Sequence, residues 1–138
     1  MARIKHNSKE IGLLARLMRS EAVGEGRYGQ KLVGNVTVNR VKAKCGTFKN
    51  VNSLTKVIYQ RGQYDGVRTK LFYGPANGTE KRLAKDCIDY WRGSPATNAL
   101  FYRNPGNVEC PKRFYGPLAG RYKKHCFYNS DTPVKCGI

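Results

Sequence analysis

The strongest constraint on the fold is a change of pattern near Gly93. Before it, apolar residues recur at helical spacing, and after it short aromatic runs alternate with turn residues, as in NALFYRNPGN and HCFYN. Apolar residues three and four apart share one helix face, whereas short aromatic runs between turns are typical of strands and loops. The sequence therefore predicts a helix-rich α+β domain whose second half is irregular.

Four helices are expected before Gly93. In the first, the apolar residues share one face, Ser8 can cap the N-terminus, and Gly24 with Gly26 interrupts the pattern. The polar and aromatic segment 60–78 is rich in glycine and proline and predicts an ordered surface segment. The expected helices run from Ser8 to residues 20–23, from Tyr28 to Lys44, over 51–59, and from Thr79 to Arg92.

Size and charge narrow the class of protein and its partners. The chain has 138 residues, the size of one domain, and 26 basic against 9 acidic residues leave a formal net charge of +17. Such an imbalance predicts a polyanionic partner: nucleic acid, acidic lipid or an anionic cell-wall polymer. No apolar run approaches the roughly 20 residues of a membrane-spanning helix, and the first ten residues lack the apolar stretch of a signal peptide. We therefore expect no transmembrane segment and no signal-dependent secretion.

Five cysteines are many for a small chain without an export signal. The odd count leaves at least one thiol unpaired within a monomer, and the spacings are not those of paired CxxC zinc sites. The sequence leaves the pairing open. Cys110 with Cys126 is the first candidate, because both lie in the irregular half, where a disulfide would help to hold the chain.

The few carboxylates are informative because there are only nine. Glu21 and Glu25 flank a glycine-containing turn, SEAVGEG, at the predicted end of the first helix. A carboxyl group there, beside apolar Ala22 and Val23, could be partly buried, and desolvation would raise its pKa until it could donate a proton near neutral pH. Glycan cleavage uses such a group. The alternative is that both glutamates are solvated or paired with nearby arginines.

A second acidic position, Asp65, has two interpretations. Its neighbours can hydrogen-bond a sugar, which would make it a binding or supporting residue, but an ordinary Asp-Gly turn explains it equally well. Those neighbours are Gln60, Gln63 and Tyr64. Four further acids are expected on solvated helix surfaces, namely Glu10, Glu80, Asp86 and Asp89.

Metal and cofactor signals are weak. His125 next to Cys126 could touch a metal, but a structural role is the better interpretation, because a zinc enzyme needs more histidine and carboxylate ligands. No Walker or dinucleotide-binding glycine motif is present. We therefore expect no metal and no cofactor. The aromatic rings, most of which follow residue 58, could stack on sugars or on bases, or could fill the core.

Four groups of residues occur in a recognisable order: LLARLMRSEAVGEGRYGQKLVGNVTVNRVKAKC, FKNVNSLTKVIYQRGQYDGV, FYRNPGN with CPKRFY, and KKHCFYN. They resemble the SleB/CwlJ family of cell-wall hydrolases, and within it the short CwlJ-type branch of spore cortex-lytic enzymes. The resemblance spans about residues 10–130. It implies one catalytic domain over residues 1–138, distantly similar to lysozymes and lytic transglycosylases. Cys45, Cys110, Cys126 and Cys136 match that branch, and Cys87 is extra.

The resemblance also implies roles for individual residues. Glu21 matches the catalytic glutamate, the first acid of an E-A-x-G-E motif, and Glu25 matches the second, supporting acid. His125 matches a family histidine without an assigned role. The candidate substrate contacts come from the IYQxGQ[FY] and [FY][FY]xNP blocks, which line the family's groove. They are Gln60, Gln63, Tyr64, Tyr102 and Asn104.

The implied reaction cleaves peptidoglycan strands between N-acetylmuramic acid and N-acetylglucosamine. Glu21 would protonate the glycosidic oxygen and then accept a proton from the muramic C6 hydroxyl, which leaves a 1,6-anhydromuramic end. This is the reaction of a lytic transglycosylase. The alternative is hydrolysis with two acids, in which Glu25 or Asp65 would be the second.

The resemblance implies a location as well. CwlJ-type proteins are made in the mother cell and assembled into the spore coat, so we expect the chain at the boundary of coat and cortex, with a coat protein as a candidate tether. A phage-encoded or virion-associated lysin would fit the same features. The positive charge suits anionic wall polymers, and nucleic acid is not expected as the partner. Two rival hypotheses are a non-enzymatic polyanion binder and a coat or virion component that has lost activity.

Overall fold

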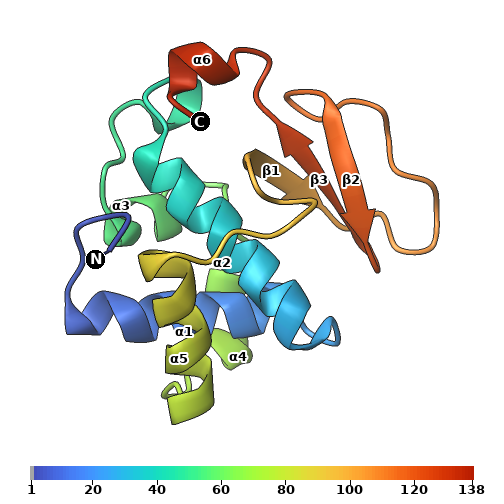
Figure 1. Cartoon of the computed structure of the whole chain (residues 1–138). Helices are drawn as coiled ribbons and strands as arrows, with labels where there is room; N and C mark the ends of the chain where they lie inside the picture. Colours follow the sequence, from blue (N-terminus) through green and yellow to red (C-terminus); the bar gives the residue numbers. More distant parts are fainter. Residues whose placement is uncertain (1) are drawn as a thin grey trace.

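Helix α2 (Gly26–Lys42) passes between a group of helices and a small sheet in the computed structural model, which describes residues 2–138 (Figure 1). Every residue of it from Leu32 to Arg40 is buried. A helix that is buried on all faces needs neighbours all around it. Those neighbours are α1 (Ser8–Glu21), α3 (Leu54–Ile58), α5 (Gly78–Asp89) and strand β1 (Ala99–Arg103).

The remaining elements complete a helix-rich α+β domain, as the sequence predicts. They are α4 (Lys70–Tyr73), β2 (Leu118–Tyr122), β3 (His125–Asn129), α6 (Pro133–Cys136) and two 3₁₀ turns, Gly46–Phe48 and Gly66–Arg68. The strands form one antiparallel sheet in the order β1-β3-β2. Within the described residues, no helix is long and apolar enough to cross a membrane.

The N-cap of α1 is Asn7 rather than Ser8, so the helix begins one residue earlier than a cap at Ser8 would allow. The Asn7 side chain accepts from the Glu10 amide, and the Glu10 carboxylate accepts from the Asn7 amide, which is a capping box. Glu10 is also corrected from a solvated to a buried residue. Its carboxylate accepts hydrogen bonds from the Thr55 amide at 3.0 Å and the Thr55 hydroxyl at 2.8 Å, and so ties α1 to α3.

The other predicted helices exist with shifted ends. Helix α2 ends two residues before Lys44, α5 ends three residues before Arg92, and α3 is shorter than predicted but has Ser53 as its cap. Segment 60–78, predicted as an ordered surface segment, is ordered but contributes to the core, because Tyr64 and Phe72 are buried.

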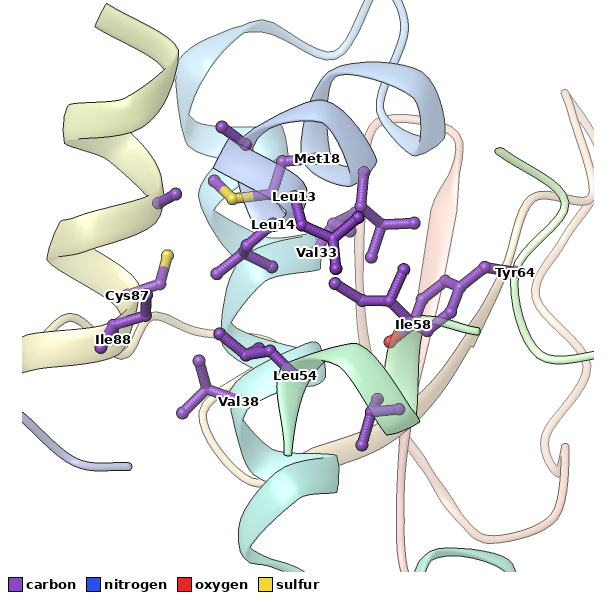
Figure 2. Packing of buried hydrophobic residues seen from close by; sticks show 14 of the residues in the cluster. Leu13, Leu14, Met18, Val33, Val38, Leu54, Ile58, Tyr64, Cys87 and Ile88 are labelled. Atoms are coloured by element: carbon purple, nitrogen blue, oxygen red, sulfur yellow. The ribbon is translucent and has the colours of Figure 1, made fainter. Parts of the chain in front are cut away.

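The main core fills the space between α1, α2, α3 and α5 (Figure 2). Helices α1 and α5 approach α2 closely at Gly34, where a Cβ would lie 2.7 Å from the Cys87 sulfur and 2.9 Å from the Met18 sulfur. Any larger residue at this position would force one or both of these side chains to shift. Burial raises the pKa of the Cys87 thiol to about 12, so this cysteine is a packing residue rather than a nucleophile.

The aromatic second half forms the sheet and its loops. Strands β1 and β3 coincide with the FYR and HCFYN runs, and Tyr102 pairs with Phe127 between them. Strand β2, LAGRY, was not predicted because it has little apolar alternation and is mostly exposed. The KRFYGP run forms a turn closed by a bridge between Arg113 and Pro117.

Two disulfides cross-link the chain, one over a short and one over a long stretch of sequence. Cys110–Cys126 confirms the first candidate pair. Cys45–Cys136, which the sequence left open, ties α6 to the segment that follows α2 across 91 residues of sequence. Cys87 is the unpaired cysteine.

Candidate active site

Glu21, the last residue of α1, lies in an open cleft of about 690 Å³ between the helices and the sheet. Segment 62–69 contributes to the helical side, and β1, β3 and the loop after β1 form the sheet side. Glu21 is at a helix end because glycines follow it, so the chain turns there and its carboxyl group is not covered by another helical turn.

Two donors hold the Glu21 carboxyl group. The Tyr102 hydroxyl donates to Oε1, and the backbone amide of Gly66 donates to Oε2. Gly66 approaches so closely that a Cβ on it would lie 2.5 Å from Glu21 Oε2. The carboxyl group is therefore held in one orientation by the helical side and the sheet side of the cleft at once.

The surroundings of Glu21 favour its protonated form. Burial raises the pKa of this carboxyl above its ordinary value, and the negative charge of Asp65 acts in the same direction. The hydrogen bonds from Tyr102 and Gly66 and the positive charge of Arg40 oppose the rise without cancelling it. Burial also holds the pKa of Tyr102 well above its usual range, so its hydroxyl stays a donor. A carboxylic acid that keeps its proton can act as a general acid.

Glu25 is engaged elsewhere. It is buried, and its Oε1 lies 2.5 Å from Nδ1 of His125 and accepts from the Lys124 amide at 3.3 Å. The His125 ring in turn packs against Tyr102, with ring centroids 5.4 Å apart. This places Glu25 and His125 in a supporting role: they fix β3 and Tyr102 relative to the α1–α2 turn.

Arg40 belongs to the site and was missed by sequence reasoning. Its guanidinium carbon lies 4.7 Å from the ring centroid of Tyr64 and 6.0 Å from that of Tyr102, and its Nε donates to the Leu100 carbonyl at 2.7 Å. Its Nη1 is buried and has no hydrogen-bond partner among the described residues. The available signal was spacing, because Arg40 follows Val36 by four residues and thus falls on an apolar face of α2.

Of the five predicted substrate contacts, Gln63, Tyr102 and Asn104 line the cleft. Asn104 is exposed, and its side chain accepts from the Gly106 amide at 2.8 Å, which fixes the loop after β1. Asp65, predicted as a supporting residue, also lines the cleft and is exposed.

The other two predicted contacts are corrected. Gln60 does not line the cleft: its Nε2 donates to the carbonyl of Thr47 at 2.8 Å and so supports a wall residue. Tyr64 is buried, with its hydroxyl 2.9 Å from Oγ1 of Thr37, and belongs to the core cluster in Figure 2. Both residues lie behind the cleft wall and support it, because segment 60–78 directs their side chains toward the interior of the protein.

The described residues contain no group of three histidine, cysteine, aspartate or glutamate side chains placed to hold a metal ion. What the arrangement provides is a carboxyl group with a raised pKa at an open cleft, flanked by polar and aromatic side chains. Such a site can protonate the oxygen of a leaving group.

Comparisons with known proteins identify the family. A family model described as Cell Wall Hydrolase matches residues 24–128. The cell wall hydrolase CwlJ of Oceanobacillus iheyensis is 45% identical over 99% of this chain and 96% of its own length. The protein of the same name from Bacillus subtilis is 40% identical over 93% of this chain and 90% of its own length.

The fold also has a solved counterpart. The catalytic domain of the germination-specific lytic transglycosylase SleB from Bacillus anthracis superposes with a TM-score of 0.73 and 26% identity, over 90% of this chain and 97% of that chain. The chain therefore belongs to the cell wall hydrolase family, as its sequence motifs indicate.

Proposed function

We propose that this protein cleaves the glycan strands of peptidoglycan between N-acetylmuramic acid and N-acetylglucosamine, as a lytic transglycosylase. The observation that carries the proposal is Glu21: a carboxyl group with a raised pKa, held by two donors at the cleft surface. Membership of the cell wall hydrolase family supports a peptidoglycan substrate.

The reaction needs one carboxyl group in two successive roles. Protonated Glu21 donates its proton to the glycosidic oxygen, and the bond from that oxygen to the muramic C1 breaks to give an oxocarbenium-like state. The muramic C6 hydroxyl oxygen then bonds to C1 and gives its proton to the Glu21 carboxylate. The acid is regenerated, the product carries a 1,6-anhydromuramic end, and no water is consumed.

The engagement of Glu25 favours this single-acid route. Its carboxylate is buried against His125, so it is not placed to activate a water molecule in the cleft. Asp65 is the other carboxylate that lines the cleft, and its exposure makes hydrolysis with Asp65 as the base the second candidate. Asp65→Asn separates the two, because only hydrolysis requires this carboxylate.

The spore cortex is the peptidoglycan that we propose as substrate, with the protein at the boundary of coat and cortex. Support comes from the similarity to a germination-specific lytic transglycosylase and to CwlJ proteins. The net charge of +17 suits adhesion to an anionic wall, which salt would weaken because exposed charges are screened over about 8 Å at physiological ionic strength. A coat protein is the proposed tether, and a phage or virion lysin is the alternative setting.

Mass spectrometry of muropeptides released from purified cortex and from vegetative peptidoglycan tests the proposal. We expect anhydromuramic ends from the wild-type protein and none from Glu21→Gln. Reducing ends that depend on Asp65 would replace the mechanism with hydrolysis. If neither wall is cleaved and the protein only adheres to it, the chain is a polyanion binder or an inactive member of the family.

A further inference from the structure

We propose that Tyr115 is the stacking platform of a saccharide subsite in the cleft, and that Arg103 beside it selects muramic acid at that subsite. The inference deepens the proposed function and rests on it. It assigns binding, not catalysis, to a part of the cleft that makes none of the contacts to the Glu21 carboxyl group.

Tyr115 is an exposed ring in the right place. It lies in the loop between β1 and β2, it lines the cleft, and 74% of its surface is exposed. Its hydroxyl makes no hydrogen bond to any residue from 2 to 138. Exposed tyrosines also occur elsewhere on the molecule, so exposure alone does not make a site.

The backbone at Tyr115 separates it from those other tyrosines. Its φ is +61°, in the left-handed region that residues with a side chain rarely adopt. The next residue must be glycine, because a Cβ on Gly116 would lie 1.8 Å from the backbone oxygen of Asn129. The turn is thus pressed against the end of β3, and glycine or asparagine would suit position 115 better than tyrosine. Unfavourable backbone of this kind concentrates at functional sites.

A row of rings supports Tyr115 from the core outward. The buried Phe48 ring lies 5.7 Å from Phe101, Phe101 lies 5.4 Å from Tyr115, and Phe114 lies 4.8 Å from Tyr115, all between ring centroids. The exposed ring is therefore held in place before any ligand arrives. A rigid aromatic surface loses little conformational entropy on binding, which is what a stacking platform requires.

Arg103 indicates which sugar binds there. Its guanidinium carbon lies 5.3 Å from the Phe114 ring centroid, its side chain is exposed, and it lines the same cleft. No carboxylate within residues 2–138 forms an ion pair with it. Of the two sugars in a peptidoglycan strand, muramic acid carries a lactyl group that ends in a carboxylate or an amide carbonyl. A guanidinium beside the platform fits that group.

The test measures binding in a Glu21→Gln background, so that no ligand is consumed. Two tetrasaccharides are titrated calorimetrically: one alternates N-acetylglucosamine and N-acetylmuramic acid, and the other is chitotetraose, which lacks the lactyl group. Tyr115→Ala should bind both about tenfold more weakly, and Tyr115→Phe should stay within about twofold of the parent, because the ring face is kept. Arg103→Gln should weaken only the muramic ligand.

Controls separate binding from folding. Tyr90→Ala is the matched control, because Tyr90 is 66% exposed and does not line the cleft. Tyr115→Asn removes the ring with a residue that tolerates the left-handed backbone, so it reports on binding even if the alanine variant is unstable. Thermal midpoints of all variants verify that they fold.

Three outcomes overturn the inference. If Tyr115→Ala and Tyr115→Asn both bind the tetrasaccharides as tightly as the parent does, Tyr115 is not a stacking platform, and the proposed function is unaffected. Equal weakening of both ligands by Arg103→Gln removes the selection of muramic acid. A parent that binds neither tetrasaccharide removes the subsite altogether, and the proposed function is then judged separately by muropeptide release from the wild-type protein.

Discussion

Gly66→Ala should disable the active site without a change in any reacting group. The backbone at Gly66 is not in the left-handed region, so alanine is conformationally acceptable there. Its Cβ would lie 2.3 Å from Ser20 Oγ and 2.5 Å from Glu21 Oε2, whereas ordinary contact begins near 3.4 Å, so the Ser20 hydroxyl must rotate away and the Glu21 carboxyl group must move by about 0.9 Å. A displacement of about 1 Å can cost on the order of a hundredfold in rate. We expect a fall of that size in kcat, with little change in KM.

The assay is the initial rate of release of muropeptides from cortex fragments, together with a thermal unfolding curve for each variant. Gly12→Ala is the matched control, because Gly12 is in the same helix as Glu21 and its Cβ would meet nothing within 4 Å. A Gly66→Ala protein that folds and retains its kcat would refute the reasoning, because Glu21 could then work without this orientation.

Three further predictions concern protonation and cross-linking. Tyr102→Phe removes a hydrogen bond that lowers the pKa of Glu21, so this pKa should rise. The alkaline limb of the pH profile of kcat/KM should then move to higher pH. A move to lower pH would contradict this prediction. Because the folded-state pKa of Glu21 is raised above its ordinary value of 4.5, the folded wild type binds more protons and loses stability as pH rises from that value. The Tm of Glu21→Gln relative to wild type should therefore increase with pH, and calorimetry that shows a constant difference would oppose this. Cys45→Ser should lower Tm more than Cys110→Ser, because their disulfides close loops with sequence separations of 91 and 16, for which chain entropy predicts about 4–5 and about 3 kcal/mol.

Interactions between residues close in sequence could be predicted. The spacing of apolar residues locates α1, α2 and α5, and Ser53 as a cap locates the start of α3. The same local pattern drew attention to Glu21 and Glu25, because both flank a glycine-containing turn at a helix end, but it left open whether either carboxyl group is solvated or paired with an arginine. The ends of the helices were less predictable, since they depend on which neighbours satisfy the last backbone groups.

Interactions between distant residues were decided by the tertiary structure. Glu25 meets His125 across 100 residues of sequence, and Cys45 meets Cys136 across 91. Neither spacing carries a signal, because the chain between the partners must fold before they are neighbours. The burial of Glu10 also depends on a distant residue, because the amide and the hydroxyl of Thr55 donate hydrogen bonds to its carboxylate.

The same distinction between local and long-range interactions applies to the active site. The sequence by itself placed Glu21 and Glu25 around a turn at a helix end, because these features are local, and the resemblance to the family selected Glu21 as the proposed acid. Only the tertiary structure decided how this acid is held, because Tyr102, Gly66 and Arg40 come from a strand, a loop and another helix. The pKa of Glu21 depends on its burial, on the hydrogen bonds that it accepts and on nearby charges. The groups responsible come from separate segments of the chain, so no single segment of the sequence predicts this pKa.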